Sequence, residues 1–220
     1  MARIPELERG GFEVTYSGGN TVVKENKDAI TSPNDSLETA QPIPMNHTVA
    51  GEIKVTRELD HDYYAIEAKA NERISVELDC VRLCDKAYAE SEYDLLVRIL
   101  DKDGKVIASC DDSDLHIQDP ILSIAAPYSG KYFVHIRQQL YKGGRWIFYR
   151  AHVGNFLRPI IAYPLGGQAG TTETVQLLGD GLGTTSEQVS WPTKSGDFRF
   201  YPGEAGAQPP SHLPLRVCTF

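Results

Sequence analysis

The sequence predicts an all-β protein built on an antiparallel β-sandwich of jelly-roll type, with an additional short β segment at the C-terminus. Two observations lead to this fold class. Short runs of alternating apolar and polar residues recur along the chain, and Gly, Pro and Asp turns separate them. In addition, no long segment has a helical period. Apolar residues make up 41% of the 220 residues, which is enough for a real core.

Residues 73–79 are the clearest predicted strand, because Ile74, Val76 and Leu78 alternate with charged residues. The turn at 101–105 predicts a hairpin, since its glycine can adopt a positive φ. Further strands are predicted at 49–55, 62–68, 94–100, 106–109, 121–125, 131–137 and 146–153.

Changes in composition divide the chain into three parts. Residues 1–30 are an N-terminal extension or the remnant of a hairpin, with strand-like runs at 12–16 and 21–23. Residues 31–157 carry the regular succession of strands. Residues 158–220 are richer in Gly, Pro and Ser, and predict either part of a second β domain or an extended arm.

The formal net charge of −8 makes nucleic acid a poor partner, because an acidic surface repels phosphate. No apolar run is long enough to span a membrane. The first nine residues lack the apolar segment of a signal peptide, so we expect any export signal to lie outside this sequence.

Four cysteines occur, at Cys80, Cys84, Cys110 and Cys218, without the spacing of a zinc site. A disulfide among the first three and buried free thiols are both compatible with this spacing.

We expect no enzymatic activity, because the sequence lacks the G-x-S-x-G, H-E-x-x-H and Cys–His motifs of hydrolases. The six histidines are scattered. His135 and His152 occupy alternating strand positions, which predicts hydrogen-bonded structural roles.

Six short motifs occur in the order typical of bacterial pre-peptidase C-terminal domains. They are Pro33-Asn34-Asp35-Ser36 with Thr39-Ala40-Gln41, Gly51-Glu52-Ile53, Asp60-His61-Asp62-Tyr63-Tyr64, the turn Asp101–Gly104, Asp111-Asp112, and the strand Gly130–Ile136. Residues 31–157 therefore resemble this family. The segment from Tyr163 to Leu182 resembles the opening of an IPT/TIG-type immunoglobulin-like domain, and the combination is similar to surface proteins of planctomycete-type bacteria.

The resemblance implies a calcium site formed by Asn34, Asp35, Asp60 and Asp62, because it places the Asn-Asp turn beside the start of a strand. Ca²⁺ prefers six to eight oxygen ligands of this kind. Calcium-binding members carry a Glu ligand just before Pro-Asn-Asp, where this chain has Ser32. A turn stabilised by its own Asn and Asp side chains is the alternative.

A second acidic group falls within nine residues, and we expect it to be a solvated loop because like charges repel. Its members are Asp111, Asp112, Asp114 and Asp119.

Aromatic residues provide a candidate ligand surface. In collagen-binding relatives, exposed tyrosines on one sheet face contact the ligand, and Tyr and Trp suit sugar or peptide recognition. The candidates are Tyr63, Tyr132, Tyr141, Trp146 and Tyr149, and a place in the core is the alternative for most of them. By this resemblance we assign ligand binding to Tyr141, Trp146 and Tyr149.

These features predict a non-catalytic accessory or binding module of a larger secreted or cell-surface bacterial protein. Its expected partners are the neighbouring domains and an extracellular protein or polysaccharide. The alternative is a structural spacer between domains that calcium makes rigid.

Overall fold

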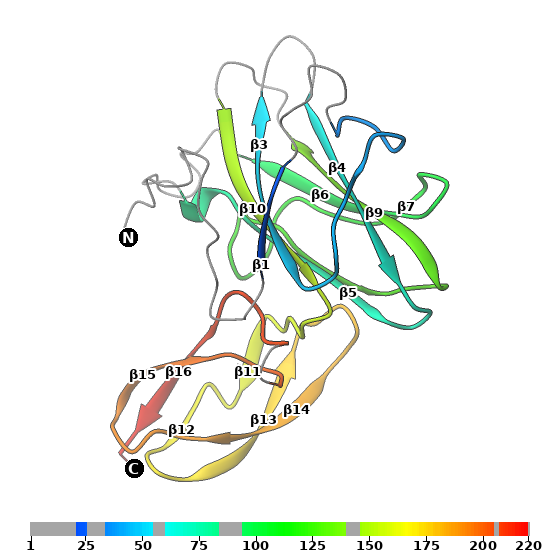
Figure 1. Ribbon diagram of the computed structural model, residues 1–220. Coiled ribbons are helices and arrows are strands. Elements are labelled where there is room, and N and C mark those ends of the chain that lie inside the picture. Colours follow the sequence, from blue (N-terminus) through cyan, green and yellow to red (C-terminus); the bar gives the residue numbers. More distant parts are fainter. Residues whose placement is uncertain are drawn as a thin grey trace.

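The structure is a computed structural model that describes residues 21–25, 34–54, 60–83, 94–139, 146–204 and 207–219. Strands dominate these ranges, and the predicted all-β class is confirmed. The strands form a large domain followed by a smaller one that packs against its lower end (Figure 1). None of the described helices is long and apolar enough to cross a membrane.

Two five-stranded sheets face each other in the large domain. The strands are β1 (Thr21–Lys24), β2 (Gln41–Pro42), β3 (His47–Lys54), β4 (His61–Ala68), β5 (Arg73–Asp79), β6 (Leu95–Leu100), β7 (Val106–Cys110), β8 (Ile121–Ala125), β9 (Gly130–Gln138) and β10 (Trp146–Gly154). One sheet has the order β1-β3-β10-β5-β8 and the other β2-β4-β9-β6-β7. A single turn of 3-10 helix, η1 (Val81–Leu83), follows β5.

Strand β5 shows why the alternation predicted this fold. Ile74, Val76 and Leu78 are completely buried between the two sheets, as expected. On the other face, however, Ser75 and Glu77 are buried as well. The face predicted to meet solvent is therefore covered, because the smaller domain packs against this part of the sheet.

The predicted hairpin at 101–105 joins β6 to β7. Gly104 has a φ of 80°, and the Asp101 carboxylate accepts hydrogen bonds from the backbone N–H groups of Asp103 and Lys105. A side chain that bonds backbone groups two and four residues ahead holds a tight turn.

The smaller domain has six strands in two three-stranded sheets. They are β11 (Ile161–Tyr163), β12 (Gly166–Gln168), β13 (Thr172–Leu178), β14 (Thr185–Ser190), β15 (Gly196–Phe200) and β16 (Leu213–Cys218). The sheets have the orders β11-β13-β14 and β12-β16-β15. Val175, Leu177, Val189, Trp191 and Leu215 fill a core between them.

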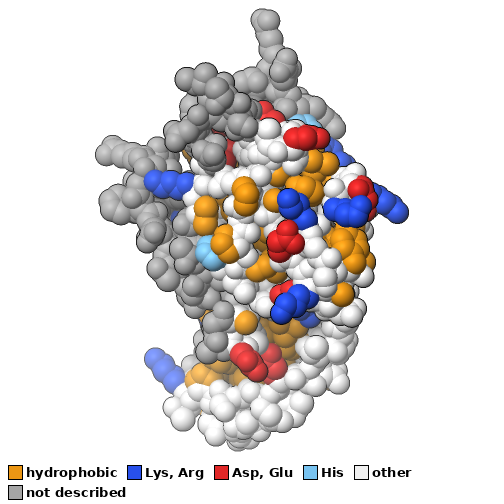
Figure 2. Space-filling model, turned by 45° about the vertical axis from the view of Figure 1, so that its right-hand side comes forward, with side chains coloured by type: hydrophobic (Ala, Val, Ile, Leu, Met, Phe, Trp, Pro, Cys, Tyr) orange, Lys and Arg blue, Asp and Glu red, His pale blue; other side chains and the backbone are white. Residues whose placement is uncertain are grey.

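Of the two alternatives for residues 158–220, the β domain is therefore present rather than the extended arm. The relation of this domain to the IPT/TIG type stays a prediction. In one view its surface carries few charged side chains, whereas charges of both signs dot the large domain (Figure 2).

The predicted N-terminal hairpin cannot be followed, because residues 12–16 lie outside the described residues. Strand β1 pairs instead with β3, and it does so in parallel, from Thr21 opposite His47 to Lys24 opposite Ala50. No disulfide joins Cys80, Cys110 and Cys218 to one another, and Cys84 lies outside the described residues.

Candidate metal centre

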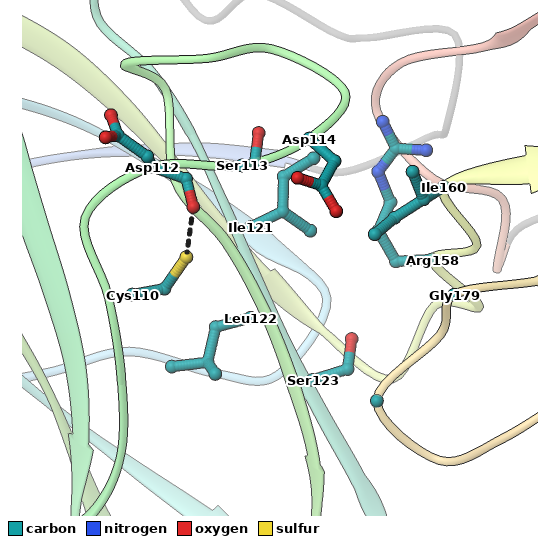
Figure 3. Close-up of a pocket in the computed structure, with 11 residues that line it drawn as sticks. Cys110, Asp112, Ser113, Asp114, Ile121, Leu122, Ser123, Arg158, Ile160 and Gly179 are labelled. Atoms are coloured by element: carbon teal, nitrogen blue, oxygen red, sulfur yellow. Dashed lines mark hydrogen bonds between the residues drawn. The ribbon is translucent and has the colours of Figure 1, made fainter.

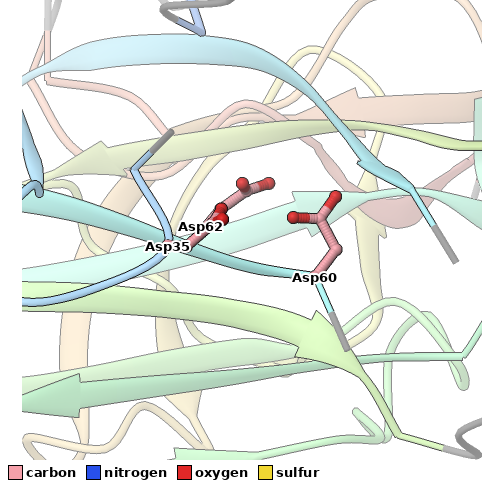
Figure 4. A group of neighbouring side chains, drawn as sticks. All are labelled: Asp35, Asp60 and Asp62. Carbon is pink, nitrogen blue, oxygen red and sulfur yellow. The ribbon is translucent and has the colours of Figure 1, made fainter. Parts of the chain in front are cut away.

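Three of the four residues assigned to calcium come together in the structure. Asp35, Asp60 and Asp62 each offer a carboxylate oxygen, and these oxygens lie within 4.8 Å of one another (Figure 4). The site lies where β3 ends and β4 begins, at the end of the large domain away from the smaller domain (Figure 1). The predicted convergence of the acidic motifs is therefore present.

The local backbone explains this convergence. The backbone N–H of Tyr63 donates a hydrogen bond to the carbonyl oxygen of Asn34 at 2.8 Å, which ties the Asn-Asp turn to the start of β4. Strand β2 then pairs in parallel with β4, with Gln41 opposite Tyr64. Residue 35 is thus held beside the two aspartates that flank His61.

Asp62 forms the buried floor of the site. Its Oδ2 accepts a 2.5 Å hydrogen bond from the hydroxyl of Tyr149, which is itself 2.5 Å from the hydroxyl of Tyr64. The other oxygen, Oδ1, is buried with no hydrogen-bond donor. Burial raises the pKa of Asp62 well above its usual value, and the nearby carboxylates of Glu25 and Asp60 raise it further.

Glu25 is a member of this region that sequence reasoning missed. It follows β1, its backbone N–H donates to the carbonyl of Ala50, and its carboxylate accepts a hydrogen bond from the backbone N–H of Glu52 at 2.8 Å. Its negative charge acts on Asp62. Only the parallel pairing of β1 with β3 brings Glu25 here, and no local sequence signal indicates that pairing.

The donor set fits calcium. A hard divalent cation binds carboxylate and carbonyl oxygens. Burying several negatively charged carboxylates together is costly when no cation balances their charge. Asp35, Asp60 and Asp62 would hold the ion, and the unpartnered Oδ1 of Asp62 is the buried acceptor it would satisfy. Asn34 is 2% exposed and lies close enough to the Tyr64 hydroxyl to lower its pKa against the rise that burial causes, so it lines the same region. Ser32 lies outside the described residues.

The assignment of Tyr149 to ligand binding is wrong. Tyr149 is 1% exposed, because it shares the inward face of β10 with Ile147, Ala151 and Val153. Its ring also lies against Gly51, where an added Cβ would be 2.4 Å from the tyrosine ring. Tyr149 supports the candidate metal centre from below instead. Tyr141 and the side chain of Trp146 lie outside the described residues.

The acidic loop at 111–119 is only partly the solvated loop that was expected. Asp112 and Asp114 are exposed, but Asp119 is completely buried. Its carboxylate accepts hydrogen bonds from the backbone N–H groups of Cys80, Val81 and Arg82, and from the Arg82 side chain at 2.7 Å. Asp119 therefore caps η1, which is a structural role.

A second group of buried charges joins the two domains. The Arg158 guanidinium lies 2.6 Å from the Glu77 carboxylate, and both side chains are fully buried. Ser211 of the smaller domain donates to the same carboxylate and accepts a hydrogen bond from Arg158 at 2.5 Å. Burial alone would raise the pKa of Glu77, but Arg158 and Arg82 outweigh it and lower the pKa.

Two further contacts fix this joint. Arg73 at the start of β5 binds both oxygens of Asp180, at 2.6 and 2.7 Å, and Asp180 also accepts the backbone N–H of Arg158. Leu115, from the acidic loop, packs against the core of the smaller domain. The two domains thus share both a charge network and apolar contacts.

The structural prediction for the strand histidines is confirmed for His152. It is completely buried, and its ring nitrogens contact the Thr48 hydroxyl at 2.7 Å and the Asp79 carboxylate at 3.1 Å.

A cavity of about 280 Å³ lies beside the joint, between the 110–114 segment with β8 and the Arg158–Ile160 and Gly179–Gly181 segments (Figure 3). The Cys110 thiol on its wall donates to the carbonyl of Asp112 at 3.1 Å. Burial raises the pKa of this thiol. Cys110 is therefore a weak nucleophile at neutral pH, since the thiolate is the reactive form.

Comparison with known proteins relates residues 60–138 of the large domain to a known family. Residues 60–138 match the family described as the bacterial pre-peptidase C-terminal domain. The chain contains a pre-peptidase C-terminal domain. The matched region holds two of the three clustered aspartates, together with β4, β5, β6, β7, β8 and β9.

Among solved structures, the pre-peptidase C-terminal domain of the collagenase from Bacillus anthracis is similar, with a TM-score of 0.39 and 15% identity over 52% of this chain and 93% of that chain. PliG from Aeromonas hydrophila is a periplasmic inhibitor of g-type lysozyme. It has a TM-score of 0.38 and 16% identity, over 52% of this chain and 96% of the inhibitor. PliG from Salmonella Typhimurium has a TM-score of 0.35 and 16% identity, over 52% of this chain and 98% of the inhibitor. No curated protein matches the sequence.

Proposed function

We propose that this chain is a non-catalytic accessory module of a larger secreted or cell-surface bacterial protein. It supports the neighbouring domains of that protein and binds extracellular protein or polysaccharide weakly. Two features support this role: the pre-peptidase C-terminal domain, and the joint that fixes a second β domain to it. The joint is the main support for this role, because a module that positions its neighbours must not bend between its own domains.

The contacts at the joint favour a fixed arrangement. Interfaces between domains of one chain are usually polar and permit relative motion. Here the fully buried Arg158–Glu77 pair, an Arg73 nitrogen that contacts both oxygens of Asp180, and the partly buried Leu115 cross the boundary. Moving the domains apart would break the Glu77–Arg158 pair and leave Glu77 with Arg82 alone, and the loss of one partner of a buried ion pair costs several kcal/mol.

Differential scanning calorimetry of the whole chain tests this rigidity. We expect one cooperative transition, in which both domains unfold together. Two separate transitions in the unaltered chain would contradict a rigid module. A panel of matrix proteins and polysaccharides tests the weak binding, and a lack of any binding on that panel would contradict that part of the role.

The acidic cluster favours a second candidate function, a spacer that calcium makes rigid. Asp35 precedes β2 and Asp60 precedes β4, so a cation bound between them would tie the incoming chain to the sandwich. Extracellular calcium modules have a Kd of roughly 0.1–1 mM. For a Kd of ~0.1 mM, 10 mM Ca²⁺ would stabilise the fold by about 2.7 kcal/mol, or roughly 5–10 °C in Tm.

Thermal unfolding in EDTA and in 10 mM CaCl₂ tests this function. We expect the Tm of the unaltered chain to rise with calcium and that of Asp62→Asn to stay constant. Asp197→Asn is the matched control, because Asp197 is exposed on β15 of the smaller domain; it should keep the full rise. An unchanged Tm of the unaltered chain in calcium would refute the calcium spacer.

A further inference from the structure

A row of aromatic and basic side chains crosses the outer face of the second sheet of the large domain. Tyr63 on β4 lies opposite His135 on β9, and His135 lies opposite Arg98 on β6. Residues directly opposite one another share a face. Because a sequence neighbour of each residue, namely Tyr64, Val134 and Val97, points into the core, the row lies on the outside.

The rings in this row stand on the sheet and stack face to face, so their polar edges rather than their faces point outward. Tyr63 stacks on His135 with ring centroids 4.3 Å apart and planes within 4°, and His61 stacks on the same imidazole at 5.0 Å. His61 Nδ1 is 2.9 Å from His135 Nε2, so the imidazoles share a hydrogen bond. His135 is 3% exposed, whereas Tyr63, His61 and Arg98 are half-buried.

Two arginines lie near this row, although the chain as a whole is acidic. The protein carries a net charge of −8, yet Arg98 and Arg137 both act on the His61, Tyr63 and His135 rings. Among the described residues, Arg98 makes no ion pair or hydrogen bond. A half-buried guanidinium that has no protein partner is suited to binding an external anion, because it is less hydrated than an ammonium group and presents a planar set of donors.

Neighbouring groups give the row a direction. Glu38 acts on Tyr63, at the end of the row away from Arg98. An anionic group would therefore bind at the Arg98 end, and an uncharged part of the same ligand would lie at the Tyr63 end. The two ends are two strand spacings apart, which is about 10 Å.

We propose that the row formed by Tyr63, His61, His135 and Arg98 binds an acidic polysaccharide. A carboxylate or sulfate would pair with Arg98, and a sugar hydroxyl would bond the Tyr63 hydroxyl at the other end of the row. Between them, imidazole nitrogens can donate to or accept from sugar hydroxyls. An acidic peptide would satisfy the arginine but lacks the neighbouring hydroxyls that the polar edges of the row would bind. The ligand class deepens the proposed accessory role and rests on it, but does not depend on calcium.

Isothermal titration at low salt with the full chain tests the proposal. The probes are heparin oligosaccharide for sulfate, oligogalacturonate for carboxylate, poly-glutamate for an acidic peptide, and dextran for a neutral glucan. We expect at least one acidic oligosaccharide to bind, with dextran silent and poly-glutamate at least about tenfold weaker. Arg98→Gln should weaken binding about tenfold, as expected for one charged hydrogen-bonded contact.

Matched variants keep the test decisive. Tyr63→Leu should also weaken saccharide binding, whereas Arg199→Gln on the smaller domain should leave it unchanged. Unchanged circular dichroism spectra and Tm values would show that the variants are folded. The proposal is overturned if neither acidic oligosaccharide binds, if Arg199→Gln weakens binding as much as Arg98→Gln, or if poly-glutamate binds as tightly and Tyr63→Leu has no effect. Running each titration in EDTA and in CaCl₂ separates its failure from that of the calcium spacer.

Discussion

Carboxylates are buried at two places in the large domain, and their charges are balanced differently there. At the joint with the smaller domain, Glu77 contacts both Arg82 and Arg158. At the opposite end, Asp62 lies beside Asp35 and Asp60. The pKa values move in opposite directions as a result. Burial opposes ionisation of Asp79 at the joint, but Arg82 and His152 lower its pKa to about 2, whereas burial and neighbouring acids raise the pKa of Asp62.

The joint is stabilised by charges of the chain itself, whereas the stability of the aspartate cluster depends on the solution conditions. A buried carboxylate is tolerated when a hydrogen-bonded cation compensates it. The chain supplies that cation at the joint through its own arginines, so the joint should hold at neutral pH in any buffer. The aspartate cluster would gain the same compensation from a bound cation or from a proton.

Removal of the buried arginine should have the largest effect on stability. Arg158→Met leaves Glu77 without its closest partner, and we expect it to lower the free energy of unfolding by about 3–5 kcal/mol. Denaturant unfolding measures this, with Arg199→Met as a control at an exposed arginine. A loss below about 1 kcal/mol would show that the joint does not depend on this ion pair.

Acidification should weaken the joint next. Because the pKa of Asp79 is about 2 in the folded state and about 3.9 in unfolded chains, its stabilisation is present above pH ~4 and is lost as the pH falls towards 2. The expected loss is about 2 kcal/mol. Unfolding of the unaltered chain and of Asp79→Asn between pH 5 and 2 measures it, and equal slopes for the two proteins would contradict it.

The aspartate cluster should show the opposite and smallest pH response. The folded pKa of Asp62 is raised, so in EDTA its contribution is most favourable below pH ~4 and is lost as the pH rises. We therefore expect Asp62→Asn in EDTA to be more stable than the unaltered chain at pH 7, by on the order of 1 kcal/mol. If Asp62→Asn were less stable than the unaltered chain at pH 7 in EDTA, the ionised Asp62 would not be unfavourable in the folded state.

Local pattern was sufficient to predict most of the fold. Alternation placed Ile74, Val76 and Leu78 in the core, and Gly104 marked its hairpin. The family motifs predicted that Asp35, Asp60 and Asp62 lie close together. Each of these signals lies within a few residues of the feature that it predicts.

The misassigned features depend on contacts between distant segments. Glu25 reaches the cluster through a parallel strand pair, and Asp119 is buried by η1, almost 40 residues earlier in the chain. Tyr149 is different, since its alternation with Ile147, Ala151 and Val153 already indicated the core face. The strand period, and not the aromatic character of Tyr149, indicates where this side chain lies.

Leu115 has a practical consequence for the boundary between the domains. Although it belongs to a loop of the large domain, it completes the hydrophobic core of the small one. A truncation after residue 157 would therefore expose more of Leu115, and a fragment starting at 158 would lose the cover that Leu115 gives to its core. The smallest piece of this chain that can be transplanted intact into another protein is accordingly the pair of domains together.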